Sequence, residues 1–180
     1  MLTRFPSEAE ILYVTQMEKE LKLKLTVPQH EGYLYATACM FTAGTRLLDL
    51  AFLHRILYPD LQSAGHYRKN AVYDSATQRV KALPRSSILA KFVTEKFMPV
   101  YQDGFRRDPH YSPDIIAWSI GATLRCLCPF DYGNGQVSYL IEHQLNLHHG
   151  SPFRYEPRPI DRFYDFRETG FKMIFQSVYQ

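Results

Sequence analysis

The residues with the clearest chemical pattern form the segment Cys-Pro-Phe-Asp-Tyr-Gly-Asn-Gly-Gln at positions 128–136. Gly133 and Gly135 permit positive φ and a close approach of the backbone to a ligand, and Asn134 also tolerates the left-handed region. Successive amides in such a turn point inward, at the positive end of a following helix. This pattern is typical of a loop that binds a diphosphate. An ordinary turn between two helices would use the same residues for conformational reasons alone.

Two expected helices would hold this segment in place. The sequence Ser-Pro-Asp at 112–114 has the pattern of a helix start, with an N-cap residue, a proline at the first helical position and an acid near the positive end. Apolar residues at helical spacing continue this helix to Cys128. A second apolar pattern runs from 137 to 145, and Gly150 closes it. We therefore expect a loop between two helices at 128–136.

The N-terminal part of the sequence also has the pattern of helices. Ser7 and Glu10 are spaced as a capping box, and apolar residues follow at helical spacing until Pro28 ends the segment. A long apolar pattern then runs from 33 to 58. Its second half, 46–58, is apolar on more than one side, which predicts a helix in the core.

The region between this core helix and the loop is more varied. Residues Asn70–Leu83 are short, tolerant of β-structure and interrupted by an Asp-Ser pair, which favours a small hairpin. A helix is expected from 84 to about 97, and 102–111 is polar and typical of a loop. The Pro-Ile-Asp sequence at 159–161 predicts a terminal helix.

Cysteines and histidines give little indication of a metal site. The three cysteines, Cys39, Cys126 and Cys128, are too few for a disulfide-stapled secreted scaffold, and no second thiol pair completes a zinc site. His148 and His149 are adjacent, so their side chains point in different directions on a helix. We expect them at a solvated helix end.

Composition limits the class of protein. The chain has 180 residues, of which 46% are apolar and 14% aromatic, and this suits a single domain over 1–180 with one packed core. The net charge of +3 is too small to indicate nucleic acid. No apolar run approaches the ~20 residues that cross a bilayer, and the N-terminus turns acidic where a signal peptide would be apolar. We expect a cytoplasmic, all-α protein with a small β-hairpin and no membrane or nucleic-acid partner; delivery into another cell without a recognisable signal is compatible with the same features.

The sequence resembles the Fic domain family, whose motif reads His-Pro-Phe-x-(Asp/Glu)-Gly-Asn-Gly-Arg in a loop between two core helices. Segments 52–60, 64–68 and 150–152 match further family elements in the same order. The expected hairpin at Asn70–Leu83 falls where the family places the flap that aligns a target protein. The resemblance covers roughly 46–166 and implies a Fic-type helical domain, with a helical extension at about 1–45 and a C-terminal helix to 180. The motif residues that match at the right spacing are Pro129, Phe130, Gly133, Asn134 and Gly135.

The resemblance implies transfer of AMP from ATP to a protein hydroxyl. In this family the motif histidine is the general base, the acid binds magnesium on the phosphates, the Gly-Asn-Gly amides hold the anion and the arginine grips phosphate. Here Cys128 stands at the position of the base, Tyr132 at that of the acid and Gln136 at that of the arginine. The matching elements also contain His54 and Arg68, which we expect to serve packing and internal hydrogen bonds.

These three substitutions oppose ordinary AMP transfer. A thiol with a pKa near ~8.5 is a poor base at neutral pH, and loss of a base costs on the order of 100- to 10,000-fold in rate. A tyrosine cannot replace a carboxylate on magnesium, and glutamine has no guanidinium charge. We therefore expect Gly133, Asn134, Gly135 and Gln136 to form a phosphate- or nucleotide-binding loop that lacks efficient transfer.

Two alternatives remain open from the sequence. In the first, the protein is an active transferase in which Cys128 is base or nucleophile, Asp131 recruits magnesium and a nearby Arg or Lys replaces Gln136. In the second, it is a protein-binding module whose flap at Asn70–Leu83 docks a target segment by strand addition, without nucleotide. ATP or another nucleotide, and magnesium, are thus implied by the resemblance alone.

Overall fold

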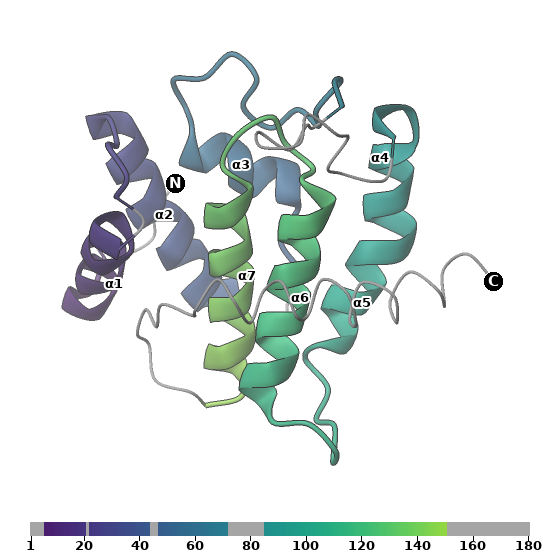
Figure 1. Cartoon of the computed structure of the whole chain (residues 1–180). Coiled ribbons are helices and arrows are strands. Elements are labelled where there is room, and N and C mark those ends of the chain that lie inside the picture. Colours follow the sequence, from purple (N-terminus) through teal and green to yellow (C-terminus); the bar gives the residue numbers. More distant parts are fainter. Residues whose placement is uncertain (1–5, 21, 44–46, 72–84, 151–180) are drawn as a thin grey trace.

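The computed structural model describes residues 6–20, 22–43, 47–71 and 85–150, which are drawn in colour in Figure 1. Every regular element in these ranges is helical, and no strand occurs among them, which confirms the expectation of an all-α protein. The expected terminal helix and nearly all of the hairpin at Asn70–Leu83 lie outside the described residues. The elements are α1 (Glu8–Glu20), α2 (Val27–Ala43), α3 (Leu50–Leu57), α4 (Ser86–Phe92), η1 (Val93–Phe97), α5 (Met98–Asp103), α6 (Pro113–Leu127) and α7 (Asn134–His148).

Helices α6 and α7 form an antiparallel pair in the middle of the molecule (Figure 1). Their facing apolar side chains are completely buried and form the centre of the core, because each helix has apolar residues at helical spacing on the side of its partner. α1 and α2 cover one side of this pair, and the rod made by α4, η1 and α5 lies on the other (Figure 1). The buried residues of the pair include Ala117, Leu124, Leu127, Val137, Leu140, Ile141 and Leu145.

The first two helices both begin at capping boxes. The expected box at α1 is confirmed: the Ser7 amide donates to the Glu10 carboxylate at 2.6 Å, and the Glu10 amide donates to the Ser7 hydroxyl at 3.4 Å. A second box opens α2, where the Gln29 amide donates to the Thr26 hydroxyl at 3.3 Å and the Thr26 amide donates to the Gln29 side chain at 3.4 Å. Pro28 therefore lies in the first turn of α2, where its missing amide hydrogen has no cost.

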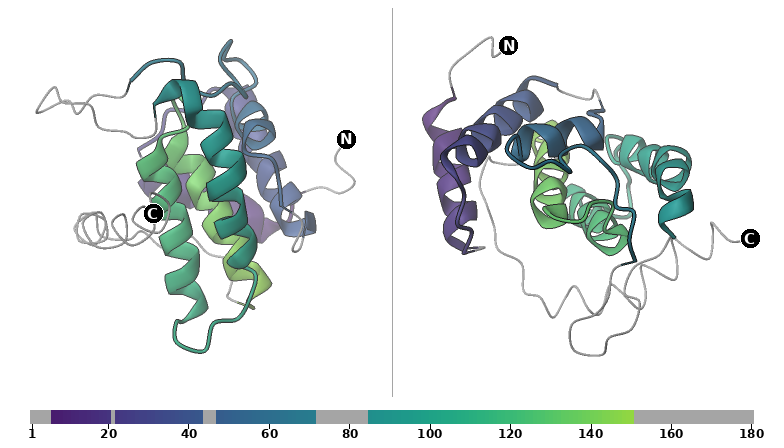
Figure 2. Two further views of the ribbon diagram at one scale, coloured as in Figure 1. Left: turned by 90° about the vertical axis from the view of Figure 1, so that its right-hand side faces the viewer. Right: turned by 90° about the horizontal axis from the view of Figure 1, so that it is seen from above.

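Helix α3 is shorter than the sequence predicted. The expected helix over 46–58 begins only at Leu50, because Asp49 is its N-cap and accepts a hydrogen bond from the Phe52 amide at 2.9 Å. Leu53 and Leu57 on its inner face are completely buried. Seen from above, α3 crosses over the ends of α6 and α7 that are joined by the 128–136 loop (Figure 2).

The rod before α6 is longer than the expected helix, which was to end near Phe97. It continues to Asp103, past Pro99, which has no amide hydrogen to donate. The chain passes this proline by way of the π-helical turn η1, in which the Met98 amide donates to the carbonyl of Val93, five residues back. Tyr101 then donates a hydrogen bond to Gln144 of α7 and attaches the rod to the central pair.

Candidate functional site

The 128–136 loop begins where α6 ends at Cys128. This residue has φ +43° and ψ 60°, a left-handed conformation that stops the helix, and its amide donates to the Leu124 carbonyl at 3.1 Å. The half-buried thiol donates to the Arg125 carbonyl at 2.9 Å, on its own helix. The thiol is thus a hydrogen-bond donor in its protonated form, which is the opposite of the role that a general base requires.

Arg68 fixes the first two peptide groups of the loop. The residue is only 2% exposed, and its Nε donates to the carbonyl of Cys128 at 2.7 Å. Its backbone amide donates to the carbonyl of Pro129 at 2.9 Å, and its Nη1 donates to the carbonyl of Asn70 at 3.0 Å. The expectation that Arg68 makes internal hydrogen bonds is confirmed. Its guanidinium stabilises the loop by donating to a backbone carbonyl.

His54 holds the middle of the loop from α3. Its ring stacks on that of Phe130, with the centroids 4.0 Å apart and the planes inclined by 12°. The amide of Gly65 donates to Nδ1 at 2.9 Å, so the ring proton lies on Nε2, which donates to the carbonyl of Tyr132 at 2.9 Å. Burial lowers the pKa of His54, against smaller opposing effects of the Tyr132 carbonyl and Asp131, and the neutral ring is the form that makes both bonds.

Asn134 closes the loop on itself. Its Oδ1 accepts from the amide of Phe130 at 2.9 Å, and its Nδ2 donates to the carbonyl of the same residue at 2.8 Å. Phe130 is completely buried, and the preceding Pro129 is buried as well. The side chains of these three motif residues therefore define the shape of the loop.

The two glycines of the motif have different roles. Gly133 has φ +75°, and a Cβ on it would lie 2.2 Å from Cε2 of Tyr58, so no larger residue fits without movement of that ring. Gly135 already belongs to α7, and nothing lies within 4 Å of the position that its Cβ would occupy. Gly133 is thus required for the turn, whereas Gly135 leaves the outside of the first turn of α7 open.

The open first turn of α7 is the part of the loop that can bind a ligand. The helix has 15 residues, and its N-cap is Gly133, whose carbonyl accepts from the Val137 amide at 3.1 Å. The amides of Asn134, Gly135 and Gln136 precede that bond and have no partner within the helix. Within the described part of the chain no side chain caps them. These amides and the helix dipole together favour an anion at this position.

The remaining motif residues do not surround this position with charge. Tyr132, at the place of the family acid, is 49% exposed, and its ring packs edge-on against Tyr58 with centroids 5.0 Å apart. Asp131 is exposed, and the side chain of Gln136 is buried. In the described ranges no three His, Cys, Asp or Glu residues gather as metal ligands. Asp131 contributes a carboxylate to the same loop, at the position next to that of the family acid.

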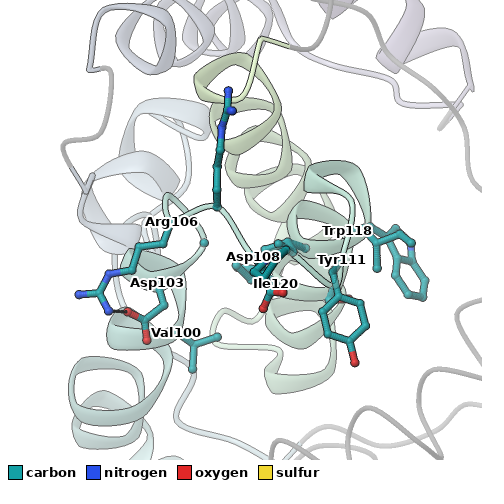
Figure 3. A pocket seen from close by; sticks show the side chains of 13 residues that line it. Val100, Asp103, Arg106, Asp108, Tyr111, Trp118 and Ile120 are labelled. Atoms are coloured by element: carbon teal, nitrogen blue, oxygen red, sulfur yellow. Dashed lines mark ion pairs between the residues drawn. The ribbon is translucent and has the colours of Figure 1, made fainter.

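A cavity of about 650 Å³ lies at the other end of α6 (Figure 3). Val100 and Asp103 lie on one side of it and Tyr111 and Trp118 on the other, and an exposed ion pair joins Arg106 to Asp103 at 3.2 Å. Most of its walls are apolar. Because α6 rises 1.5 Å per residue, this cavity and the 128–136 loop are separated by about 15 Å along the helix. No motif in the sequence indicates the cavity.

The histidine pair at the end of α7 is not simply solvated, as the sequence suggested. Nε2 of His148 donates to the carbonyl of Phe105 at 3.1 Å, and Nε2 of His149 donates to the carbonyl of Gly104 at 2.8 Å. The pair therefore attaches the end of α7 to the turn that follows α5. Both imidazoles therefore make hydrogen bonds that stabilise the fold.

Comparison of the sequence with models of protein families gave no match, and a search among curated proteins gave none either. The similarity to Fic domains therefore rests on the motif residues and their order. Among the described helices, none has both the length and the apolar character that a membrane span needs.

Proposed function

We propose that this chain is a Fic-type protein whose degenerate motif binds a phosphate group without efficient transfer of AMP. The observation that carries the proposal is the first turn of α7, where the amides of 134–136 precede the first hydrogen bond of the helix, next to a loop whose backbone is held by Asn134 and Arg68. A preorganised set of amides binds an anion without the loss of conformational entropy that ordering a flexible loop would cost. Because the seat is made of backbone, it fits the phosphate of any nucleotide, and equally pyrophosphate.

The same loop supports the second part of the proposal, which is that AMP transfer is inefficient. The thiol of Cys128 donates to a backbone carbonyl, and the carboxylate expected at position 132 is a tyrosine. Position 136 holds a buried glutamine in place of a guanidinium. Without a base and without charge to stabilise the transferring group, the loop can hold a phosphate and still leave it unreacted. Because a tyrosine stands in place of the family acid, we expect binding that does not depend on magnesium.

A thermal-shift titration with pyrophosphate and with ATP, each with and without magnesium, tests binding. A ligand at tenfold excess over its Kd stabilises the folded state by about 1.4 kcal/mol, so the unfolding midpoint should rise at millimolar ligand. Gly135→Asp places a carboxylate at the seat and should abolish the rise, and Gly135→Asn is the uncharged control of the same shape. An acid in the first turn stabilises a helix, so loss of binding in Gly135→Asp would not reflect unfolding.

The same proteins test the absence of chemistry. With labelled ATP and a mixture of candidate proteins, we expect no transfer of label above that of the Gly135→Asp variant. Magnesium-dependent labelling that disappears in Cys128→Ala would establish an active transferase instead. If no ligand raises the unfolding midpoint of the unchanged chain, the 128–136 loop is a turn and the proposal is wrong.

A further inference from the structure

Arg125, three residues before the loop, contacts both ends of it. At the start of the loop, its carbonyl accepts the hydrogen bond from the Cys128 thiol at 2.9 Å. At the other end, its Nη1 donates to the Ser138 hydroxyl at 2.6 Å, and that hydroxyl donates to the carbonyl of Gly135 at 2.9 Å. A chain of hydrogen bonds thus leads from this guanidinium to the first turn of α7.

The guanidinium itself is held firmly. The same Nη1 donates to Oε1 of Glu142 at 2.6 Å, and the carbon of the guanidinium lies 5.2 Å from the centre of the Tyr139 ring. The side chains of Arg125 and Glu142 are 17% and 10% exposed, so the ion pair is largely removed from solvent. Such a pair is expensive to bury and is weak evidence for stability by itself.

Helix α6 makes room for this arrangement at Gly121. A Cβ on that residue would lie 2.1 Å from Oε1 of Glu142, so the carboxylate occupies the space that a larger side chain would fill. Two helices are thus joined by a buried ion pair, with a glycine opposite it, and by a serine hydroxyl that is completely removed from solvent. Burying these polar groups costs free energy of desolvation. Apolar side chains would join them at lower cost, which indicates a role other than stability.

We propose that Arg125 is a positioning residue for the phosphate-binding loop, which it holds in register through Ser138. This inference rests on the proposed function. By fixing the carbonyl of Gly135, Arg125 sets the direction of the first peptide groups of α7, whose amides form the anion seat. The guanidinium is neutralised by Glu142 and does not itself bind the ligand.

The experiment separates positioning from stability. Arg125→Met and Glu142→Met each remove one partner of the buried ion pair and should destabilise the fold, whereas the double variant replaces the pair by apolar side chains and should recover stability. Arg106→Met removes the same charge from an exposed ion pair at the end of α5 and is the matched control. For each protein, two quantities are measured: the pyrophosphate affinity by calorimetry and the hydrogen exchange of the amides at 134–137.

In the double variant we expect recovered stability, a pyrophosphate affinity lower by about tenfold or more, and faster exchange at 134–137, as when a partner behind a ligand-binding group is removed. Arg106→Met should change neither quantity. A stable double variant that binds pyrophosphate and exchanges like the unchanged chain would overturn the inference and leave Arg125 a structural residue. If the unchanged chain does not bind pyrophosphate, the proposed function fails by itself. The exchange rates then still decide: faster exchange in the double variant supports the positioning of the loop, and unchanged exchange contradicts it.

Discussion

The two ends of α6 differ in what surrounds them. At its C-terminal end, the 128–136 loop is packed against buried polar groups, with Arg68, His54 and Asn134 each bonded to its backbone. At its N-terminal end lies a largely apolar cavity of about 650 Å³, with charged side chains exposed at its edge. The C-terminal end has a recognisable motif, whereas the N-terminal end has a cavity and no motif.

This difference shows what kind of ligand each end can accept. Small-molecule sites are usually concave and enclose most of the ligand. The cavity fits this description, whereas an anion at the first turn of α7 would be held by amides and a helix dipole. The buried polar side chains behind the loop make hydrogen bonds that hold its backbone in place. We therefore assign them no catalytic role.

The largest expected effect separates the two glycines of the loop. Gly133→Ala combines a left-handed conformation with a contact of 2.2 Å to Tyr58, and should lower the free energy of unfolding by about 3 kcal/mol. Gly135→Ala places a methyl group in open space within a helix and should raise it by about 1 kcal/mol. Urea denaturation measures both. Equal effects would show that the turn at Gly133 differs from the one described.

Acid should weaken the fold through a buried histidine of α7. His143 stacks on Tyr13 at 4.0 Å, and burial lowers the pKa of His143 to about 3. In the unfolded chain the pKa is about 6.5, so the contribution of this histidine to stability is complete above that pH and is lost as the pH falls toward 3. Between pH 7 and 5 the unchanged chain should lose about 2 kcal/mol more than His143→Phe, measured by urea denaturation at each pH. Parallel loss in both proteins would contradict a buried, neutral His143.

A smaller effect is expected at the start of the loop. Cys128 has φ +43°, which costs a residue with a side chain roughly 1 kcal/mol relative to glycine. Cys128→Gly and Cys128→Ala both remove the thiol, so the difference between their free energies of unfolding isolates the backbone. Glycine should be the more stable by about 1 kcal/mol, the reverse of the usual ranking in helices. If alanine is as stable as glycine, the left-handed cap is absent.

Binding of an anion at the loop should have no effect on the cavity at the other end of α6. Trp118 is the single tryptophan of the chain and lines the cavity, about 15 Å along α6 from the loop. Saturating pyrophosphate should therefore leave its fluorescence unchanged while raising the unfolding midpoint. A change in emission that follows the binding curve would place the anion near the cavity.

Local signals in the sequence predicted many of the helix ends. The capping box at Ser7 and the proline start at Pro113 were read correctly, since each depends on residues within one turn. Pro28 was expected to end the first helix, but α1 already ends at Glu20, and Pro28 lies in the first turn of α2. Pro99 does not end its helix, because the π-helical turn before it accommodates a residue that has no backbone N–H to donate.

For the residues that hold the loop, the sequence predicted that they make hydrogen bonds but not which groups they bond to. Arg68 and His54 were expected to make internal hydrogen bonds, but their partners lie far along the chain: the bond from His54 to the Tyr132 carbonyl spans 78 residues. The contribution of Tyr58 to the need for glycine at 133 has no local signal at all. Arg125 was missed because its partners are on another helix.

The most direct test of the central claim is a titration of the 15N-labelled chain with pyrophosphate, followed by NMR at the amide resonances. If the first turn of α7 is an anion seat, the amides of Asn134, Gly135 and Gln136 should shift most, in one saturable process, and should not shift in Gly135→Asp. Shifts confined to the cavity between Val100 and Ile120, or no shifts at millimolar pyrophosphate, would contradict it.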